Sequence, residues 1–142
     1  MVVVTGAAQG IGAACARRLV QDGAAVALWD LADAAGQALV DELTAAGAQA
    51  LYQRCNVADK AQVDAALAAT LAHFGRVDGL VNNAGIFKAA PFLEITEEDW
   101  DAVLDVNLKG HFLVGQAVAR ELVKNAGDRR GAIVNMSSVN GT

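Results

Sequence analysis

A glycine-rich stretch near the start of the chain has the residue types and spacing for ligand chemistry. Residues 5–12 read Thr-Gly-Ala-Ala-Gln-Gly-Ile-Gly and follow the apolar run Val2-Val3-Val4. Glycines let a backbone turn tightly and approach a ligand closely, and the N–H groups at a helix N-terminus attract anions. The stretch therefore predicts a phosphate-binding loop. A glycine-rich turn that binds no ligand is the alternative.

An acidic residue follows this loop at the distance that a dinucleotide site needs. Asp30 ends the apolar run 25–29, close to the offset of about 20 residues at which an acid accepts hydrogen bonds from the adenosine ribose. An acid there repels a 2′-phosphate, and Gln9 supplies no compensating positive charge. We therefore expect NAD(H) to be preferred over NADP(H). The alternative is that Asp30 is an ordinary polar residue at a strand end.

The pattern around these groups predicts the elements that hold them. Apolar β-branched runs predict strands, and apolar residues at helical spacing predict helices. The expected strands are residues 2–5, 25–29, 48–54, 77–81 and 132–136. The expected helices are residues 10–22, 33–46, 60–74 and 97–124, the last kinked near Gly110. Asp59 and Thr96 are the expected N-caps, with Asp99 completing a capping box, and Gly47 and Gly75 end two helices.

Strands that alternate with helices, and that are apolar along nearly their whole length, predict an α/β fold. The sheet should be parallel, doubly wound and covered on both faces, as in a three-layer α/β/α Rossmann arrangement. The expected strand order is 3-2-1-4-5, which places a ligand crevice at the carboxyl ends of strands 1 and 4. Length predicts one domain over residues 1–142.

Composition excludes several classes of function. A net charge of −5 argues against nucleic acid as a partner, and no apolar run is long enough for a membrane span. The N-terminus has no signal-peptide pattern, so a cytoplasmic protein is expected. Cys15 and Cys55 lack metal-site spacing, which predicts no metal and two reduced packing residues, with Cys15 facing the core.

A second motif, Asn82-Asn83-Ala84-Gly85, follows the fourth expected strand. Together with Thr-Gly-x-x-x-Gly-Ile-Gly, it resembles the short-chain dehydrogenase/reductase family over essentially the whole chain. The resemblance implies that Asn82 ties adjacent strands together. It also implies a set of cofactor-binding residues: Gly6, Gln9, Gly10, Ile11, Gly12, Asp30, Leu31, Asn56, Val57, Asn83, Ala84 and Gly85.

The resemblance implies roles for three further polar residues. The family commonly has an aspartate that meets the adenine where this chain has Asn56, whose amide oxygen can still accept; a plain strand end is the alternative. Asn107 would distort the long helix and hold a water of a proton relay, although a solvated helix residue is the alternative. Ser138 would hydrogen-bond the substrate oxygen, whereas a serine pair after a strand is otherwise unremarkable.

The general acid/base of the resembled family is absent from these residues. It is a tyrosine in Tyr-x-x-x-Lys, expected about a dozen residues beyond Ser138, whereas the sequence given stops at Thr142. Tyr52, the only tyrosine, is not followed by this pattern. The intact enzyme is expected to interconvert a secondary alcohol and a ketone with NAD(H). The alternative is a catalytically incomplete fragment or binding module that binds NAD(H) without turnover.

Substrate and partners are less well defined by the sequence. Sugar alcohols, hydroxy steroids, hydroxyacyl thioesters and cyclic alcohols all remain open as small-molecule substrates. The apolar stripe of the 97–124 helix exceeds what one sheet can cover, and family members often pair this helix, which predicts a homodimer or homotetramer. Trp100 and Phe112 are expected to pack, and His73 and His111 to have structural roles. A nucleotide-sugar epimerase is disfavoured, because its loop has Gly-x-x-Gly-x-x-Gly spacing.

Overall fold

The computed structural model describes residues 1–127 and 131–138, so the turn predicted at 125–131 lies partly outside the described residues. The strands are β1 (Val2–Thr5), β2 (Val26–Asp30), β3 (Ala50–Arg54), β4 (Gly79–Asn82) and β5 (Ala132–Asn135). The helices are α1 (Gly10–Gln21), α2 (Asp33–Ala45), α3 (Lys60–Phe74), α4 (Glu97–Leu104) and α5 (His111–Leu122). A short 3₁₀ turn, η1 (Phe92–Glu94), precedes α4, and a π-helical segment, η2 (Asp105–Gly110), joins α4 to α5.

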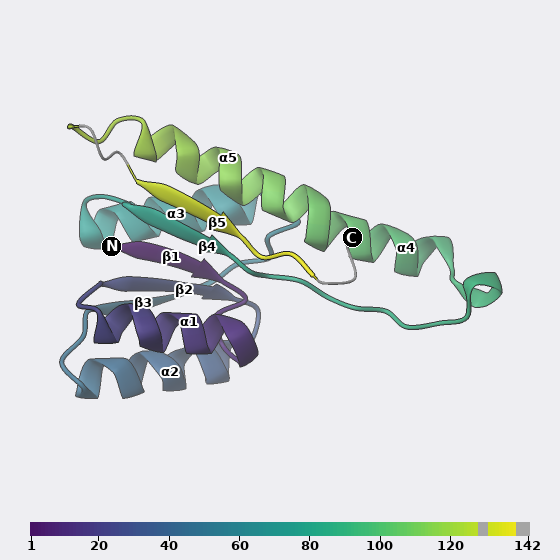
Figure 1. The fold of residues 1–142 in the computed structure, drawn as a ribbon, viewed down its shortest axis with the longest axis horizontal. Helices are drawn as coiled ribbons and strands as arrows, with labels where there is room; N and C mark the ends of the chain where they lie inside the picture. The colour runs from purple at the N-terminus through teal and green to yellow at the C-terminus, as the bar shows by residue number, and fades with distance from the viewer. Residues whose placement is uncertain (128–130, 139–142) are drawn as a thin grey trace.

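The five strands form one parallel sheet in the order β3-β2-β1-β4-β5. Helices α1 and α2 cover one face, and α3 and α5 cover the other (Figure 1). This arrangement confirms the predicted three-layer α/β/α Rossmann fold and the predicted strand order. The order reverses direction between β1 and β4, so the carboxyl ends of these two strands flank the crevice.

Two apolar cores lie on the two faces of the sheet. Adjacent residues of β1 point to opposite faces, so Val3 packs with the α3 and α5 side and Val4 with the α1 and α2 side. Trp29 and Cys55 are fully or almost fully buried in the first core. Cys15 was expected to face the core, and it is only partly buried at the edge of the second one.

The predicted helix ends are largely confirmed. The Asp59 carboxylate accepts hydrogen bonds from the N–H groups of Ala61 and Gln62, at 2.9 and 3.3 Å. Gly75 ends α3 in the left-handed region, with a φ of 78°. The Thr96 hydroxyl accepts from the N–H of Asp99 at 3.1 Å.

Several predicted element bounds shift by one or two residues, and three details of the predicted elements are wrong for a local reason. The Asp99 side chain pairs with Lys88 at 2.8 Å, and within the described residues the Thr96 N–H does not donate to it, so the capping box is not completed. Strand β3 begins at Ala50 and not at residue 48, because the N–H of Ala48 still donates to Leu43 at the end of α2. Strand β4 spans Gly79–Asn82 and not 77–81, because its ladder with β1 begins at Gly79.

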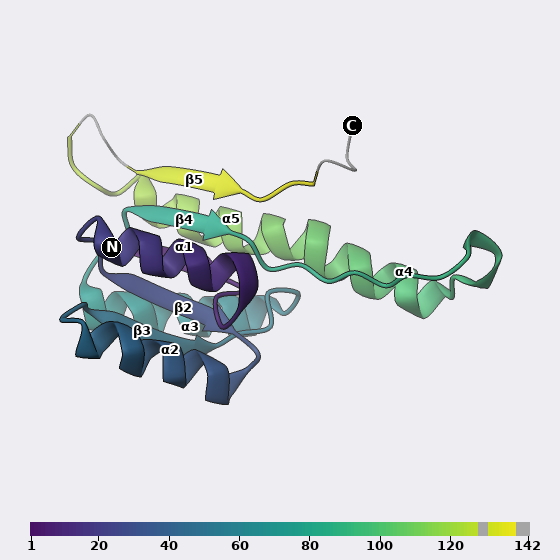
Figure 2. The same cartoon turned by 60° about the horizontal axis from the view of Figure 1, so that its bottom comes forward.

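The segment from α4 to the start of α5 extends away from the sheet. Figure 2 shows α4 and the loop before it projecting beyond the strand ends. Trp100 is 57% exposed and Phe112 is 59% exposed, so the prediction that both pack is wrong for this chain. The strands end before α4 (Figure 2), whereas Phe112 is exposed although the carbonyl of its neighbour His111 accepts from Asn82 of β4. Leu108 is exposed as well, whereas Val118 further along α5 is fully buried, so the apolar stripe does exceed what the sheet covers.

Candidate cofactor site

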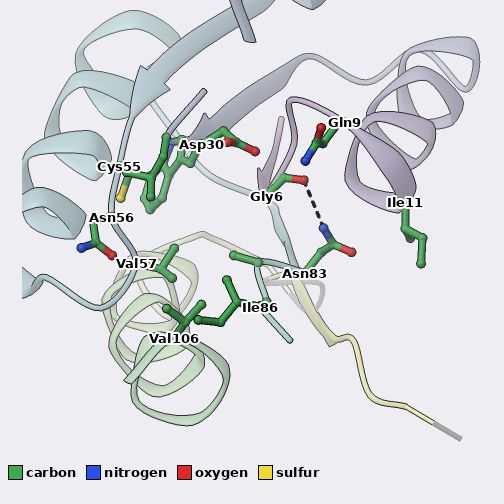
Figure 3. A pocket seen from close by; sticks show the side chains of 14 residues that line it. Gly6, Gln9, Ile11, Asp30, Cys55, Asn56, Val57, Asn83, Ile86 and Val106 are labelled. Carbon is green, nitrogen blue, oxygen red and sulfur yellow. Dashed lines mark hydrogen bonds between the residues drawn. The ribbon is translucent and has the colours of Figure 1, made fainter. Parts of the chain in front are cut away.

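A cavity of about 440 Å³ opens at the carboxyl ends of β1 to β4, at the predicted crevice (Figure 3). It is bounded by the glycine-rich loop on one side and by the Asn-Asn-Ala-Gly segment on another. Its lining residues are Gly6, Gln9, Ile11, Trp29, Asp30, Leu31, Cys55, Asn56, Val57, Asn83, Ala84, Gly85, Ile86 and Val106.

The glycine-rich loop packs too closely for side chains at two positions. A Cβ on Gly12 would lie 2.1 Å from the carbonyl oxygen of Gly6, and a Cβ on Gly6 would lie 2.9 Å from the Cα of Ala84. Gly6 also has a φ of 60°, which side-chain-bearing residues rarely adopt. Glycine therefore brings the loop, α1 and the end of β4 together at the mouth of the cavity.

The N-terminus of α1 points its first-turn N–H groups toward this mouth. The first N–H with a helical partner is that of Ala13, which donates to Gln9, so those of Gly10, Ile11 and Gly12 precede the hydrogen-bonded helix. The Gln9 side chain does not cap them. Such N–H groups, with the helix dipole behind them, suit a pyrophosphate.

The Asp30 carboxylate, which lines the cavity, is held by two backbone groups. One oxygen accepts from the N–H of Ala8 at 2.9 Å, and the other accepts from the N–H of Ala32 at 3.0 Å. A carboxylate oxygen can accept more than one hydrogen bond, so both retain capacity for ribose hydroxyls.

The floor of the cavity is apolar. Trp29 is fully buried, and its indole N–H donates to the Thr70 hydroxyl at 3.1 Å. Cys55 and Val57 lie beside it, and burial raises the pKa of the Cys55 thiol to about 12, with the nearby Asp59 adding to the effect. The thiol is therefore neutral near pH 7, and an apolar floor of this kind suits an aromatic base.

Asn56 makes hydrogen bonds within its own turn. Its amide oxygen accepts from the N–H of Ala58 at 3.0 Å, and its backbone N–H donates to the Gln62 side chain at 2.9 Å. These bonds brace the turn, and the amide oxygen, which already accepts one hydrogen bond, can accept one more. An adenine contact from Asn56 is compatible with this geometry.

Thr5 and Asn83 join the ends of β1 and β4. The Thr5 hydroxyl accepts from the N–H groups of Asn83 and Ala84, at 2.9 and 3.0 Å. In return, the Asn83 amide donates to the carbonyl of Thr5 at 3.0 Å and to that of Gly6 at 3.2 Å, the bond drawn in Figure 3. These bonds fix the ends of β1 and β4, between which the strand order reverses, relative to one another.

Asn82 ties β4 to its other neighbours, as the resemblance implied. Its amide donates to the Asn135 side chain on β5 at 3.0 Å and to the carbonyl of His111 on α5 at 2.9 Å. The His111 ring nitrogen Nε2 lies 3.0 Å from the carbonyl oxygen of Ala84. The Asn-Asn-Ala-Gly segment is therefore braced from both flanking elements.

Asn107 lies in the π-helical segment, where the regular helix is interrupted. Its amide oxygen accepts from the N–H of Ile86 at 2.8 Å, and its amide nitrogen donates to the carbonyl of Ile86 at 2.9 Å. Ser138 lies just beyond the end of β5 and is exposed. Neither Asn107 nor Ser138 lines the cavity.

The family profile described as short chain dehydrogenase matches residues 1–142. The chain belongs to the short chain dehydrogenase family.

Its similarity to individual relatives extends along the whole chain. D-threitol dehydrogenase from Mycolicibacterium smegmatis is 44% identical over 138 residues, which are 97% of this chain and 52% of the relative. The crystal structure of a 3-ketoacyl-ACP reductase from Sinorhizobium meliloti has a TM-score of 0.94 at 36% identity, over 99% of this chain and 55% of that one. A short chain dehydrogenase/reductase from Burkholderia phymatum in complex with NAD has a TM-score of 0.92 at 36% identity, over 99% and 49%. The chain thus spans about half the length of the relatives it matches.

Most of the residues predicted to bind the cofactor line the cavity. Gly10 and Gly12 do not line it: Gly10 starts α1 with a φ of 58°, and Gly12 packs against the carbonyl of Gly6. Sequence reasoning missed four lining residues, each of which is next to a predicted one: Trp29, Cys55, Ile86 and Val106. The apolar run 25–29 predicted a buried strand that ends at Trp29, and Cys55 was predicted to be a packing residue. Only the three-dimensional arrangement shows that both residues also line the cavity.

The described residues of the chain show neither a candidate metal centre nor a helix that could span a membrane. Within residues 1–127 and 131–138, no group of three or more His, Cys, Asp or Glu side chains is placed to hold a metal ion. Across the same residues, no helix has the length and apolar character needed to cross a membrane.

Proposed function

We propose that the protein is an oxidoreductase that interconverts a secondary alcohol and a ketone and prefers NAD(H) to NADP(H). The observation that carries the proposal is the Asp30 carboxylate, oriented by two backbone N–H groups beside a cavity with a phosphate-binding loop. An acid in this position favours ribose hydroxyls and repels a 2′-phosphate. The bound nicotinamide would exchange hydride with the carbon that bears the oxygen.

Different residues of the chain bind different parts of the dinucleotide. The first turn of α1 holds the pyrophosphate, and Asp30 and Leu31 hold the adenosine ribose. Asn56 and Val57 contact the adenine, with Trp29 and Cys55 beneath them as the apolar floor. At the other end, Asn83, Ala84 and Gly85 line the path toward the nicotinamide.

Two further residues act on the substrate side. Ser138 donates a hydrogen bond to the substrate oxygen and stabilises the charge that develops there. Both side-chain amide groups of Asn107 are already paired with Ile86, so we assign its part in proton transfer to the main chain of the π-helical segment. The proton itself is moved by a tyrosine of a Tyr-x-x-x-Lys motif, which these 142 residues do not include.

Similarity narrows the substrate and location proposals. D-threitol dehydrogenase and a 3-ketoacyl-ACP reductase are among the relatives, which makes polyols and 3-ketoacyl thioesters the first substrates to assay. We further propose a cytoplasmic enzyme whose partners are small molecules and not nucleic acid or membranes, in line with a net charge of −5.

We propose a homodimer or homotetramer that forms through the helical segment 97–124. Leu108 and Phe112, on the projecting part of this segment, are 67% and 59% exposed, and pairing would remove them from water. Light scattering tests this: a substitution Leu108→Glu should lower the molar mass of the assembly, and an unchanged mass would contradict the proposed interface.

The test of the activity combines an intact mass with a turnover assay. A protein much heavier than 14.6 kDa that oxidises secondary alcohols with NAD⁺ supports the proposal. A protein of about that mass that binds NADH without turnover supports the alternative, a binding module that lacks the acid/base residue. Alcohol oxidation by a verified chain of this mass would show that our assignment of the proton-transfer tyrosine is wrong.

A further inference from the structure

Two side chains of β3 brace the turn that follows Asp30. The Arg54 guanidinium donates to the carbonyl of Leu31 at 2.6 Å and to the Asp33 carboxylate at 2.8 Å. The Tyr52 hydroxyl lies 2.8 Å from the other oxygen of Asp33 and 2.9 Å from the carbonyl oxygen of Asp30. Asp33, the first residue of α2, therefore links both side chains to the turn.

The Tyr52 ring is held firmly in place beneath α2. A Cβ on Gly36 would lie 2.2 Å from the ring, so glycine is what lets the helix approach this closely. Burial and the neighbouring Asp33 raise the pKa of Tyr52, so its hydroxyl remains a hydrogen-bond donor across the working pH range. The position of the Asp33 carboxylate is thus set by a fixed donor as well as by the ion pair.

This cluster lies next to the group proposed to select the cofactor. Asp30 and Arg54 are paired residues of neighbouring strands, and Leu31, which holds the guanidinium through its carbonyl, lines the cavity. Arg54 itself does not line the cavity. A guanidinium is the group that accommodates a 2′-phosphate in NADP sites, because its planar donors match phosphate geometry. Arg54 thus places a guanidinium, which can bind phosphate, close to the proposed ribose site. Its donors contact the Leu31 carbonyl and the Asp33 carboxylate and do not line the cavity.

We propose that Asp33 is a specificity-determining residue: it holds Arg54 against the Leu31 carbonyl and so keeps the guanidinium from a 2′-phosphate. This inference rests on the proposed NAD(H) function and extends it to a second position. Asp33 acts on the nucleotide through Arg54, so it is a positioning residue, whereas Asp30 contacts the ribose directly.

The size of the effect follows from the exposure of the pair. The side chains of Arg54 and Asp33 are 59% and 61% exposed. An exposed ion pair changes an equilibrium by about fivefold at most. Release of Arg54 should therefore weaken the discrimination against NADP(H) without reversing it.

The experiment is a double-mutant cycle read out by nucleotide binding. Dissociation constants for NADH and NADPH are measured for the wild-type protein, Asp33→Asn, Arg54→Gln and the double variant. The ratio of the NADPH constant to the NADH constant should fall about threefold to fivefold in Asp33→Asn. When Arg54→Gln is already present, Asp33→Asn should lower this ratio by less than about half as much.

A matched control and a second variant test whether the change in the ratio is specific to the contacts of Asp33. Asp64→Asn removes a comparably exposed carboxylate, paired with Lys60 on α3, and should leave the ratio unchanged. Tyr52→Phe removes the hydroxyl that positions Asp33, and should lower the ratio in the same direction by a smaller factor.

Two results would overturn the inference alone: a ratio that Asp33→Asn does not change, or an equal fall in both Arg54 backgrounds. The second would mean that the Asp33 charge acts directly on the nucleotide. A wild-type protein that binds neither nucleotide would overturn the proposed function as well, so the two failures are distinguishable.

Discussion

The carboxylate of Asp30 accepts a hydrogen bond from the N–H of Ala8, 2.9 Å away, which joins the end of β2 to the glycine-rich loop after β1. The group proposed to recognise the ribose is thus attached to the loop proposed to hold the pyrophosphate. Because the two groups are fixed together before a ligand arrives, less ordering is required on binding.

The two helical glycines Gly12 and Gly115 should respond oppositely to alanine. A methyl group on Gly12 collides with the carbonyl of Gly6, so Gly12→Ala should lower the free energy of unfolding by about 1–3 kcal/mol and weaken NADH binding. On Gly115 the nearest atom is 3.8 Å away, so Gly115→Ala should stabilise α5 by up to about 1 kcal/mol. Urea unfolding and NADH titration measure both effects. Wild-type stability and affinity in Gly12→Ala would contradict this packing.

Thr70 should contribute more to the free energy of unfolding than Thr44, whose hydroxyl makes the same kind of helical hydrogen bond. Its hydroxyl accepts from the buried Trp29 indole, so Thr70→Val leaves that donor unpaired and should cost about 1–3 kcal/mol of unfolding free energy. Thr44 also donates to a carbonyl one helical turn back but is exposed, so Thr44→Val should change stability by less than about 0.5 kcal/mol. Equal effects in urea denaturation would show that the Trp29 bond contributes little.

Much of the fold was predictable because its determinants are local. The apolar run of β1, the Asp59 cap and the left-handed Gly75 each depend on neighbours within a few residues. The strand order followed from the alternation of elements, and the Asp30 position followed from its distance to the loop. These features of the site are properties of the chain before it folds.

The features that sequence reasoning missed depend on contacts between distant segments. The sequence predicted that Trp29 lies in a buried strand and that Cys55 is a packing residue. Both also line the cavity, because β2 and β3 pair in one particular register. The exposure of Trp100 depends on where the sheet ends beneath the long helix. Nothing in the helical spacing of this residue carries that information.

The pairing of Asn107 with Ile86 should be visible in amide hydrogen exchange. Asn107→Ala removes the acceptor of the Ile86 N–H, so exchange at Ile86 should accelerate about threefold to tenfold. Asn125→Ala serves as the control, because Asn125 donates to the carbonyl of Val77 at the opposite end of the molecule. Unchanged exchange at Ile86 in Asn107→Ala would mean that this pairing is absent in solution.

The buried Cys55 thiol should resist alkylation in the folded protein. Its pKa is raised to about 12, so little thiolate is present at pH 8, and iodoacetamide should label it far more slowly than in urea. The pKa of the Cys55 thiol is higher in the folded protein than in the unfolded chain, where it is about 8.5. The contribution of this thiol to the free energy of unfolding is therefore complete below about pH 8.5 and is lost as the pH rises toward 12. Cys55→Ala should flatten that decline. Rapid labelling of native Cys55 would contradict its burial.

Titration calorimetry with NADH and NADPH, on the wild-type protein and on Asp30→Asn, tests the central claim most directly. We predict that wild-type protein binds NADH more tightly than NADPH, and that Asp30→Asn narrows the difference by about tenfold or more. Failure to bind NADH, or a preference for NADPH that Asp30→Asn leaves unchanged, would contradict the account.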